Sequence, residues 1–190
     1  MARNKFNYKD ITFDSQEEIA FYKWLEEAKI LGIVEHWDYQ PESFKLFDKA
    51  TVSISKQLKT KTKELEKTIL QQHVYTADYY IKFNESIKEF NTHLKNIDLL
   101  NRTDIWIDIK GGFGSFGSHS NFSVESKWVW QKYGILTEKI IPDKFFRHTW
   151  VPEDCRFTPK TLQEKKKYIG YNTFEVITNK IMRDKLEWLK

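Results

Sequence analysis

The stretch Ile105-Trp106-Ile107-Asp108-Ile109-Lys110-Gly111-Gly112 is rich in aromatic and β-branched residues and ends in two glycines. This composition predicts a β-strand. Side chains alternate between the two faces of a strand, so Asp108 and Lys110 point the same way and the isoleucines point into a core. A carboxylate in this position can hold a divalent cation, and a neighbouring ammonium group can stabilise charge on an attacking water or a phosphate.

A second stretch, Tyr75-Thr76-Ala77-Asp78-Tyr79-Tyr80, precedes the first by thirty residues and is also predicted to be a strand. An acid inside such a strand is unfavourable without a partner. Asp78 is therefore a second candidate for the same site. The alternative is an aspartate in a turn at the end of a strand.

The bulk composition sets limits on the class of protein. The 190 residues fit one domain with a small appendage, and 31 Lys and Arg against 27 Asp and Glu give a net charge of +4. This mild excess permits nucleic-acid binding without requiring it. The single Cys155 excludes an intramolecular disulfide and a cysteine-cluster zinc site. Because no long apolar stretch is present, we expect a soluble, cytoplasmic protein with no membrane partner.

The hydrophobic pattern predicts a helix, a strand, several strands with an insertion, a further strand, a helix and a strand, followed by a C-terminal helix. The predicted ranges are 15–31 for the first helix, 33–40 for the strand after it, 43–83 for the group of strands, 105–110, 122–133, 135–141 and 173–189. This order predicts an α/β fold with a mixed sheet. We expect a core at 1–142 and a C-terminal helical extension at 143–190, packed on the core or on a partner subunit.

A lysine-rich insertion at about 50–70 interrupts the predicted strands. In Lys59-Thr60-Lys61-Thr62-Lys63 every second residue is a lysine, so in a strand these lysines would line one face. Two interpretations remain open. The insertion is either an edge strand that lysine protects from aggregation, or a wing that lies against a phosphate backbone.

Taken in order, these motifs resemble the PD-(D/E)xK nuclease superfamily, and within it small phage nucleases of the endonuclease I type, which cut branched DNA. The resemblance covers about 13–141 and implies a restriction-endonuclease-like core with a central mixed sheet flanked by helices. Asp108-Ile109-Lys110 stands at the (D/E)-x-K triplet. Asp78 stands at the preceding acid, with Ala77 where the family often has proline. Ser15-Gln16-Glu17-Glu18 resembles an S-x-x-E helix start, which selects Glu18.

The resemblance also implies roles for these residues. Asp78 and Asp108 would bind Mg²⁺ or Mn²⁺ together with the Ile109 carbonyl, Glu18 would hold a second cation or orient water, and Lys110 would help to activate the water or stabilise the transition state. Lys127 lies on the helix after the triplet, where relatives often place basic or polar residues near the site. The implied function is a metal-dependent DNA endonuclease. A homodimer would bring the two sites that cutting both strands requires.

Several alternatives stay open. Ser15 and Glu18 also fit a capping box, in which the glutamate bonds to backbone at the helix start. At about 100° per residue, Glu17 falls nearer the centre of the apolar helix face than Glu18 does, so Glu17 remains a rival. A non-catalytic DNA-binding or assembly protein with the same fold is the alternative function. No sequence feature separates branched from linear DNA, or DNA from RNA.

Overall fold

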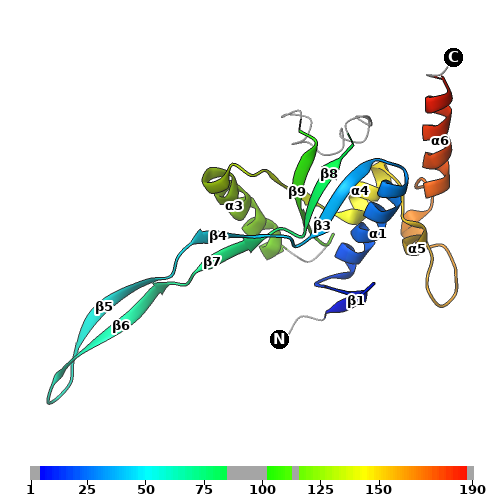
Figure 1. Ribbon diagram of the computed structural model, residues 1–190. Helices are drawn as coiled ribbons and strands as arrows, with labels where there is room; N and C mark the ends of the chain where they lie inside the picture. Colours follow the sequence, from blue (N-terminus) through cyan, green and yellow to red (C-terminus); the bar gives the residue numbers. More distant parts are fainter. Residues whose placement is uncertain (1–4, 85–101, 113–115, 188–190) are drawn as a thin grey trace.

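The computed structural model describes residues 5–84, 102–112 and 116–187. Their centre is a four-stranded mixed sheet with the order β10-β9-β8-β3 (Figure 1). Its strands are β3 (Val34–Tyr39), β8 (Tyr79–Phe83), β9 (Asp104–Ile109) and β10 (Thr137–Ile140). The β3–β8 and β8–β9 pairs are antiparallel, and the β9–β10 pair is parallel. The predicted α/β class with a mixed sheet is confirmed.

The first helix, α1 (Gln16–Ile30), has the ends that its sequence favours. Ser15 is its N-cap and accepts a hydrogen bond from the Glu18 backbone N–H. Gly32 follows the helix with φ +71°, a conformation that glycine adopts without strain. The helix packs on β3 and is preceded by a small hairpin of β1 (Phe6–Tyr8) and β2 (Ile11–Phe13).

The two faces of the sheet are covered by different helices. Ile105, Ile107 and Ile109 belong to the main core, which also contains the buried face of α1. Trp106, on the other face of the same strand, packs against a smaller core that includes Val129 of α3 (Phe116–Tyr133). The alternation predicted for β9 therefore separates the two cores. Helix α3 is also the crossover between the parallel strands β9 and β10, and it starts at Phe116 rather than at the predicted Phe122.

The C-terminal extension packs on the core of its own chain. It contains α4 (Pro142–His148), α5 (Glu153–Arg156), a short 3₁₀ helix η2 (Lys166–Tyr168) and α6 (Phe174–Glu187). Trp150 is fully buried in the main core, and its indole N–H donates to Glu27 of α1 at 2.6 Å. On α6, Ile177 is buried and Ile181 packs partly on the core, whereas Val176 is 51% exposed. The predicted end of this helix, at 188–189, lies outside the described residues.

A long two-stranded arm projects from the sheet (Figure 1). Its base pairs β4 (Ser43–Phe47) with β7 (His73–Thr76), and its outer part pairs β5 (Ala50–Gln57) with β6 (Thr62–Leu70). The expectation that Lys59, Lys61 and Lys63 alternate along one strand is wrong. The chain reverses between Leu58 and Lys61, where the Leu58 N–H donates to the Lys61 carbonyl at 2.9 Å, so only Lys63 lies in a strand.

None of the helices in the described ranges is long and apolar enough to cross a membrane. Residues 85–101, before β9, and 113–115, after Gly112, lie outside the described residues.

Candidate functional site

Asp78 lies in a break between two strands rather than inside one. Strand β7 ends at Thr76 and β8 begins at Tyr79. The break is held from one side by Gln40, whose N–H donates to the Asp78 carbonyl at 2.9 Å. On the other side, the Asp78 carboxylate accepts the Ile109 N–H at 2.6 Å. The side chain is therefore fixed at the end of β9, beside the predicted triplet.

Asp108 and Lys110 do point the same way. The Lys110 ammonium lies 2.6 Å from an Asp108 carboxylate oxygen, and the two side chains are only 20% and 6% exposed. The backbone of Lys110 continues the sheet, because its N–H donates to the Ile140 carbonyl at 2.9 Å. The lysine is thus held at the strand end by its own backbone and by its partner acid.

Burial and like charges shape the electrostatics of the two acids. Burial, and then the negative charges of Asp108 and Glu18, hold the pKa of the Asp78 carboxyl well above its ordinary value, although the Ile109 N–H and Lys110 oppose this shift. Burial also raises the pKa of Asp108, against the opposing effect of Lys110. Ionising both acids in the absence of a further cation is therefore unfavourable.

The acids line a shared cavity of about 330 Å³ at the base of the arm. Its lining consists of Asp14, Gln40, Val74, Tyr75, Thr76, Asp78, Asp108, Lys110 and Glu125. Four of these residues carry a carboxylate and one carries an ammonium group. Asp14 is paired outside the cavity lining with Lys5. The remaining excess of negative charge, together with the raised pKa values, fits a site for a divalent cation with oxygen ligands.

The ligand set is incomplete when judged by acids alone. Among the described residues, no group of three or more His, Cys, Asp or Glu side chains is arranged to hold a metal ion. The set implied by the resemblance has two aspartates, with the Ile109 backbone carbonyl as a third oxygen. This set therefore needs a backbone oxygen and water molecules as further ligands. Mg²⁺ usually keeps several waters in its coordination shell, so such a set suits Mg²⁺ better than one made of protein side chains alone.

Glu18 does not line this cavity. Its carboxylate accepts from the Asp14 N–H at 3.1 Å, from the Ser15 hydroxyl at 2.8 Å and from the Tyr39 hydroxyl at 2.7 Å. The Ser15 hydroxyl in turn accepts the Glu18 N–H at 3.1 Å. This is the reciprocal bonding of a capping box, except that the glutamate takes the N–H before the cap residue. The buried carboxylate still acts on the site through its charge, which helps to raise the pKa of Asp78.

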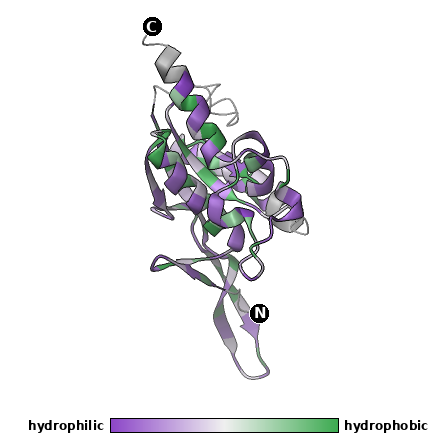
Figure 2. Cartoon of the chain, turned by 90° about the vertical axis from the view of Figure 1, so that its right-hand side faces the viewer, coloured by the Kyte–Doolittle hydropathy of each residue, from purple (hydrophilic) through white to green (hydrophobic). Residues whose placement is uncertain are grey.

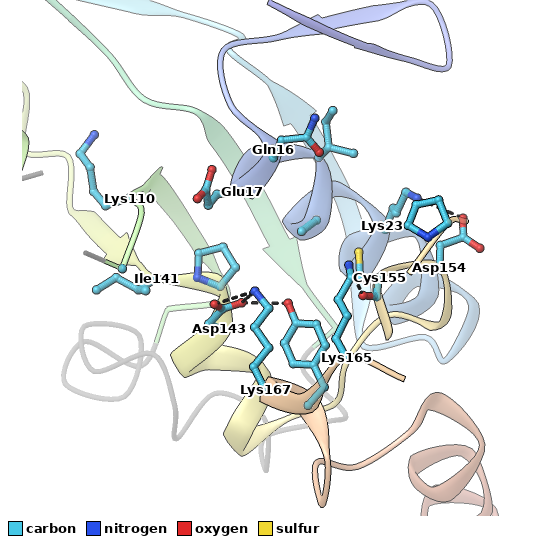
Figure 3. A pocket seen from close by; sticks show the side chains of 16 residues that line it. Gln16, Glu17, Lys23, Lys110, Ile141, Asp143, Asp154, Cys155, Lys165 and Lys167 are labelled. Atoms are coloured by element: carbon cyan, nitrogen blue, oxygen red, sulfur yellow. Dashed lines mark hydrogen bonds and ion pairs between the residues drawn. The ribbon is translucent and has the colours of Figure 1, made fainter. Parts of the chain in front are cut away.

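Glu17 faces a different cavity, of about 270 Å³, between α1 and the C-terminal extension (Figure 3). A Cβ placed on Gly111 would lie 3.6 Å from a Glu17 carboxylate oxygen, so this acid approaches the backbone after the triplet. Lys110 lines both cavities. In the second cavity, Lys167 of the extension pairs with Asp143 at 2.9 Å. The two glutamates at the start of α1 therefore have different environments: Glu18 is hydrogen-bonded at the helix start, and Glu17 lines the second cavity.

The sequence reasoning missed Glu125 and its partner. Glu125 is the single acid in α3 and lines the acidic cavity, where its carboxylate lies 2.8 Å from His73 Nε2 of β7. The signal available in the sequence was weak, namely one acid in a helix that otherwise carries lysines and aromatics. The predicted Lys127 is exposed and does not line the cavity. Lys59, Lys61 and Lys63 lie at the far end of the arm.

Comparison with known proteins identified no relative of this chain. No protein-family model matches it, and no curated protein or solved structure matches it either. The function proposed below therefore rests on the fold and on the residues of the acidic cavity.

Proposed function

We propose that the protein is a Mg²⁺- or Mn²⁺-dependent DNA endonuclease of the PD-(D/E)xK type. One observation carries this proposal. Asp78, directly before β8, and Asp108, in the neighbouring strand β9, line one cavity together with Lys110. The order of elements adds support, because α1, β3, β8, β9, α3 and β10 follow the helix, strands, helix and strand that the resemblance implies. The finer restriction-endonuclease-like assignment of the core is part of this proposal.

The residues of the cavity divide the chemistry among them. Asp78, Asp108 and the Ile109 carbonyl would hold the cation through oxygen atoms. A divalent cation bound there lowers the pKa of water and offsets phosphate charge. The Lys110 ammonium, already held beside Asp108, would stabilise negative charge on the attacking water or the phosphate. Glu125, which His73 positions, offers a third acid for orienting water, the role that the resemblance gives to Glu18.

The test is nicking of supercoiled plasmid in Mg²⁺ or Mn²⁺, with EDTA as the metal-free reference. We expect Asp108→Ala and Lys110→Ala to lose cleavage by on the order of 10²-fold or more, because each removes a ligand or a charge partner of the transition state. Asp38→Ala and Lys29→Ala remove the same residue types from outside the cavity and should cleave normally. Near-normal activity of both site variants, with folding unchanged, contradicts the site as proposed.

A non-catalytic DNA-binding or assembly protein is the second candidate. The observation that favours it is the Asp108–Lys110 ion pair, since a purely structural pair would satisfy both charges without a cation. The two candidates differ in the plasmid assay. DNA binding without metal-dependent nicking by the wild-type protein supports the second candidate and excludes the first.

Substrate shape needs a separate measurement. The branched-DNA preference of the endonuclease I-type nucleases is a proposal for this chain, and cleavage of a four-way junction beside a matched linear duplex tests it. A homodimer is likewise proposed, because one chain offers one triplet and cutting both strands needs two sites. Light scattering with and without DNA tests the dimer, and a monomer under both conditions would leave a nickase.

A further inference from the structure

The outer part of the arm is a ribbon with two chemically different faces. Directly paired residues of an antiparallel ribbon share a face, so the register assigns each side chain. One face carries Val52, Ile54 and Lys56 of β5 with Lys63, Leu65 and Lys67 of β6. The other carries Thr51, Ser53, Ser55 and Gln57 of β5 with Thr62, Glu64, Glu66 and Thr68 of β6. We call the first the lysine–aliphatic face and the second the glutamate–hydroxyl face.

The lysine–aliphatic face is open to solvent. Val52 and Ile54 are each 41% exposed, and the three lysines of this face are also exposed. None of these lysines forms an ion pair with any described residue. Neither buried core includes a residue of β5 or β6. Folding of the domain therefore does not account for the separation of lysines and glutamates onto opposite faces.

We propose that the lysine–aliphatic face of β5 and β6 binds duplex DNA. This inference rests on the proposed function for the identity of the substrate. Charge complementarity favours DNA as the partner, because Lys56, Lys63 and Lys67 on one face can neutralise phosphates. Glu64 and Glu66 on the opposite face repel phosphates and so define which side of the ribbon turns to the DNA. The aliphatic side chains between the lysines suit the apolar sugar edges and thymine methyl groups.

The dimensions agree with this occupant. The eight paired residues of β5 span roughly 26 Å at about 3.3 Å per residue, somewhat less than the ~34 Å of one turn of B-DNA. A two-stranded ribbon also fits the major groove. The arm starts at the acidic cavity, because Val74, Tyr75 and Thr76 of its base line that cavity. DNA bound at the cavity can therefore reach the ribbon within about one helical turn.

A second copy of the chain fits this face less well. Two lysine–aliphatic faces packed on each other would bring two sets of unpaired lysines together. The arm as a whole is rich in hydrophilic residues, which suits a hydrated, charged partner such as DNA better than an apolar one (Figure 2).

The test is binding of a fluorescent linear duplex of about three helical turns in EDTA, where cleavage does not interfere, over a series of salt concentrations. Lys56→Gln/Lys63→Gln removes two charges from the lysine–aliphatic face. We expect the slope of log K against log salt to become shallower by roughly 2, with on the order of 10-fold weaker binding at low salt. Lys160→Gln/Lys180→Gln removes two charges from exposed lysines of the extension and should leave the slope near that of the wild type.

Each outcome bears on the inference separately from the nuclease proposal. An unchanged slope for Lys56→Gln/Lys63→Gln, or the same loss in the Lys160→Gln/Lys180→Gln control, overturns it, and so does a wild-type protein that does not bind duplex. A shallower slope in the arm variant that accompanies loss of a dimer in light scattering assigns the face to a second copy and also overturns it. If the wild-type protein binds but never cleaves, the nuclease proposal fails and the salt slopes still decide the role of the arm.

Discussion

Asp78 and Asp108 are buried carboxylates, and the negative charge of Asp108 adds to the effect of burial in raising the pKa of Asp78. This raised pKa has a measurable consequence for stability. Because the pKa of Asp78 is raised, the folded protein keeps this proton at pH values where the unfolded chain has lost it. The folded state then binds more protons than the unfolded state, so metal-free stability falls as pH rises from the ordinary aspartate value to the raised one. A bound cation removes this loss.

Asp78→Asn should therefore raise the melting temperature of the metal-free protein. The amide oxygen can still accept the Ile109 N–H, so the fixed geometry at the end of β9 is kept. The difference from the wild type should grow with pH through that window and then level off, with each kcal/mol worth roughly 2–4 °C. Mg²⁺ should raise the melting temperature of the wild-type protein and not of the variant. Equal stabilisation of both proteins by Mg²⁺ would exclude Asp78 as a ligand.

Three glutamates compete for the role of the third acid, and the structure gives each a different environment. Glu18→Gln replaces one acceptor oxygen by a donor amide where three donors converge, so it should cost about 1–2 kcal/mol of unfolding free energy. Glu17 is exposed, so Glu17→Gln should lower the free energy of unfolding by less than about 0.5 kcal/mol. In plasmid nicking we expect Glu18→Gln to be impaired more than Glu17→Gln, and Glu125→Gln to lose on the order of tenfold.

Denaturant unfolding separates the structural loss in these variants from the chemical one. A Glu125→Gln variant with wild-type cleavage would remove this acid from the mechanism. The reverse ranking of the two α1 variants would show that the S-x-x-E alignment is off by one residue.

The sequence allowed one part of this site to be predicted and not the other. Asp108 and Lys110 follow from strand alternation alone, which needs only local pattern. Glu125 and His73 are 52 residues apart and meet only because α3 packs against the base of the arm. The location of Glu18 also depended on tertiary contacts, since Tyr39 of β3 supplies one of the donors that hold its carboxylate away from the cavity.

Helix α3 braces the base of the arm through backbone carbonyls. The Lys132 ammonium donates to the Lys45 and Leu46 carbonyls at 2.8 and 3.2 Å, and the Tyr133 hydroxyl donates to the Lys45 carbonyl at 2.6 Å. These contacts position β4 beside β7, whose residues line the acidic cavity. The brace therefore couples the direction of the arm to the site.

Lys132→Met/Tyr133→Phe removes all three of these bonds and keeps most of the apolar volume. Because both side chains are exposed, we expect a loss of only about 1–2 kcal/mol in global stability. Hydrogen exchange should quicken in β4 and β7 relative to β8 and β9. Uniform acceleration over all four strands would show that the brace stabilises the whole domain rather than the arm.

The elements with strong local periodicity were predictable, and their interruptions were less so. Helix α1 and strand β9 match the expected ranges closely because apolar spacing, an N-cap serine and following glycines all agree. The turn at Leu58–Lys61 was hidden because lysine and threonine alternate through it and neither glycine nor proline marks it. The start of α3 was hidden because Gly117 and several serines are weak helix formers.

The arm and the C-terminal extension both branch from the central sheet, and they relate to the core in opposite ways. Phe145, Phe146 and Trp150 of the extension are buried in the main core, and Phe145 packs edge-on against Phe21 of α1 at a ring-centroid distance of 5.6 Å. The outer arm leaves its β5 residues from Thr51 to Gln57 exposed. The boundary expected at 142 therefore marks a change of sequence pattern inside one continuous core.

Two deletions test this difference. Replacing Val52–Lys67 by Asn-Gly joins the paired Thr51 and Thr68 through a two-residue hairpin turn, and it should leave the melting temperature within a few degrees of the wild type.

Ending the chain at Ile141 removes several buried aromatics, each worth about 3–5 kcal/mol, and typical total stability is only about 5–15 kcal/mol. The truncated chain should therefore show no cooperative thermal transition by circular dichroism, whereas the armless chain keeps one and binds DNA more weakly. A cooperative transition in the truncated chain would show that 1–141 folds on its own, and an unfolded armless chain would show that the ribbon takes part in folding the domain.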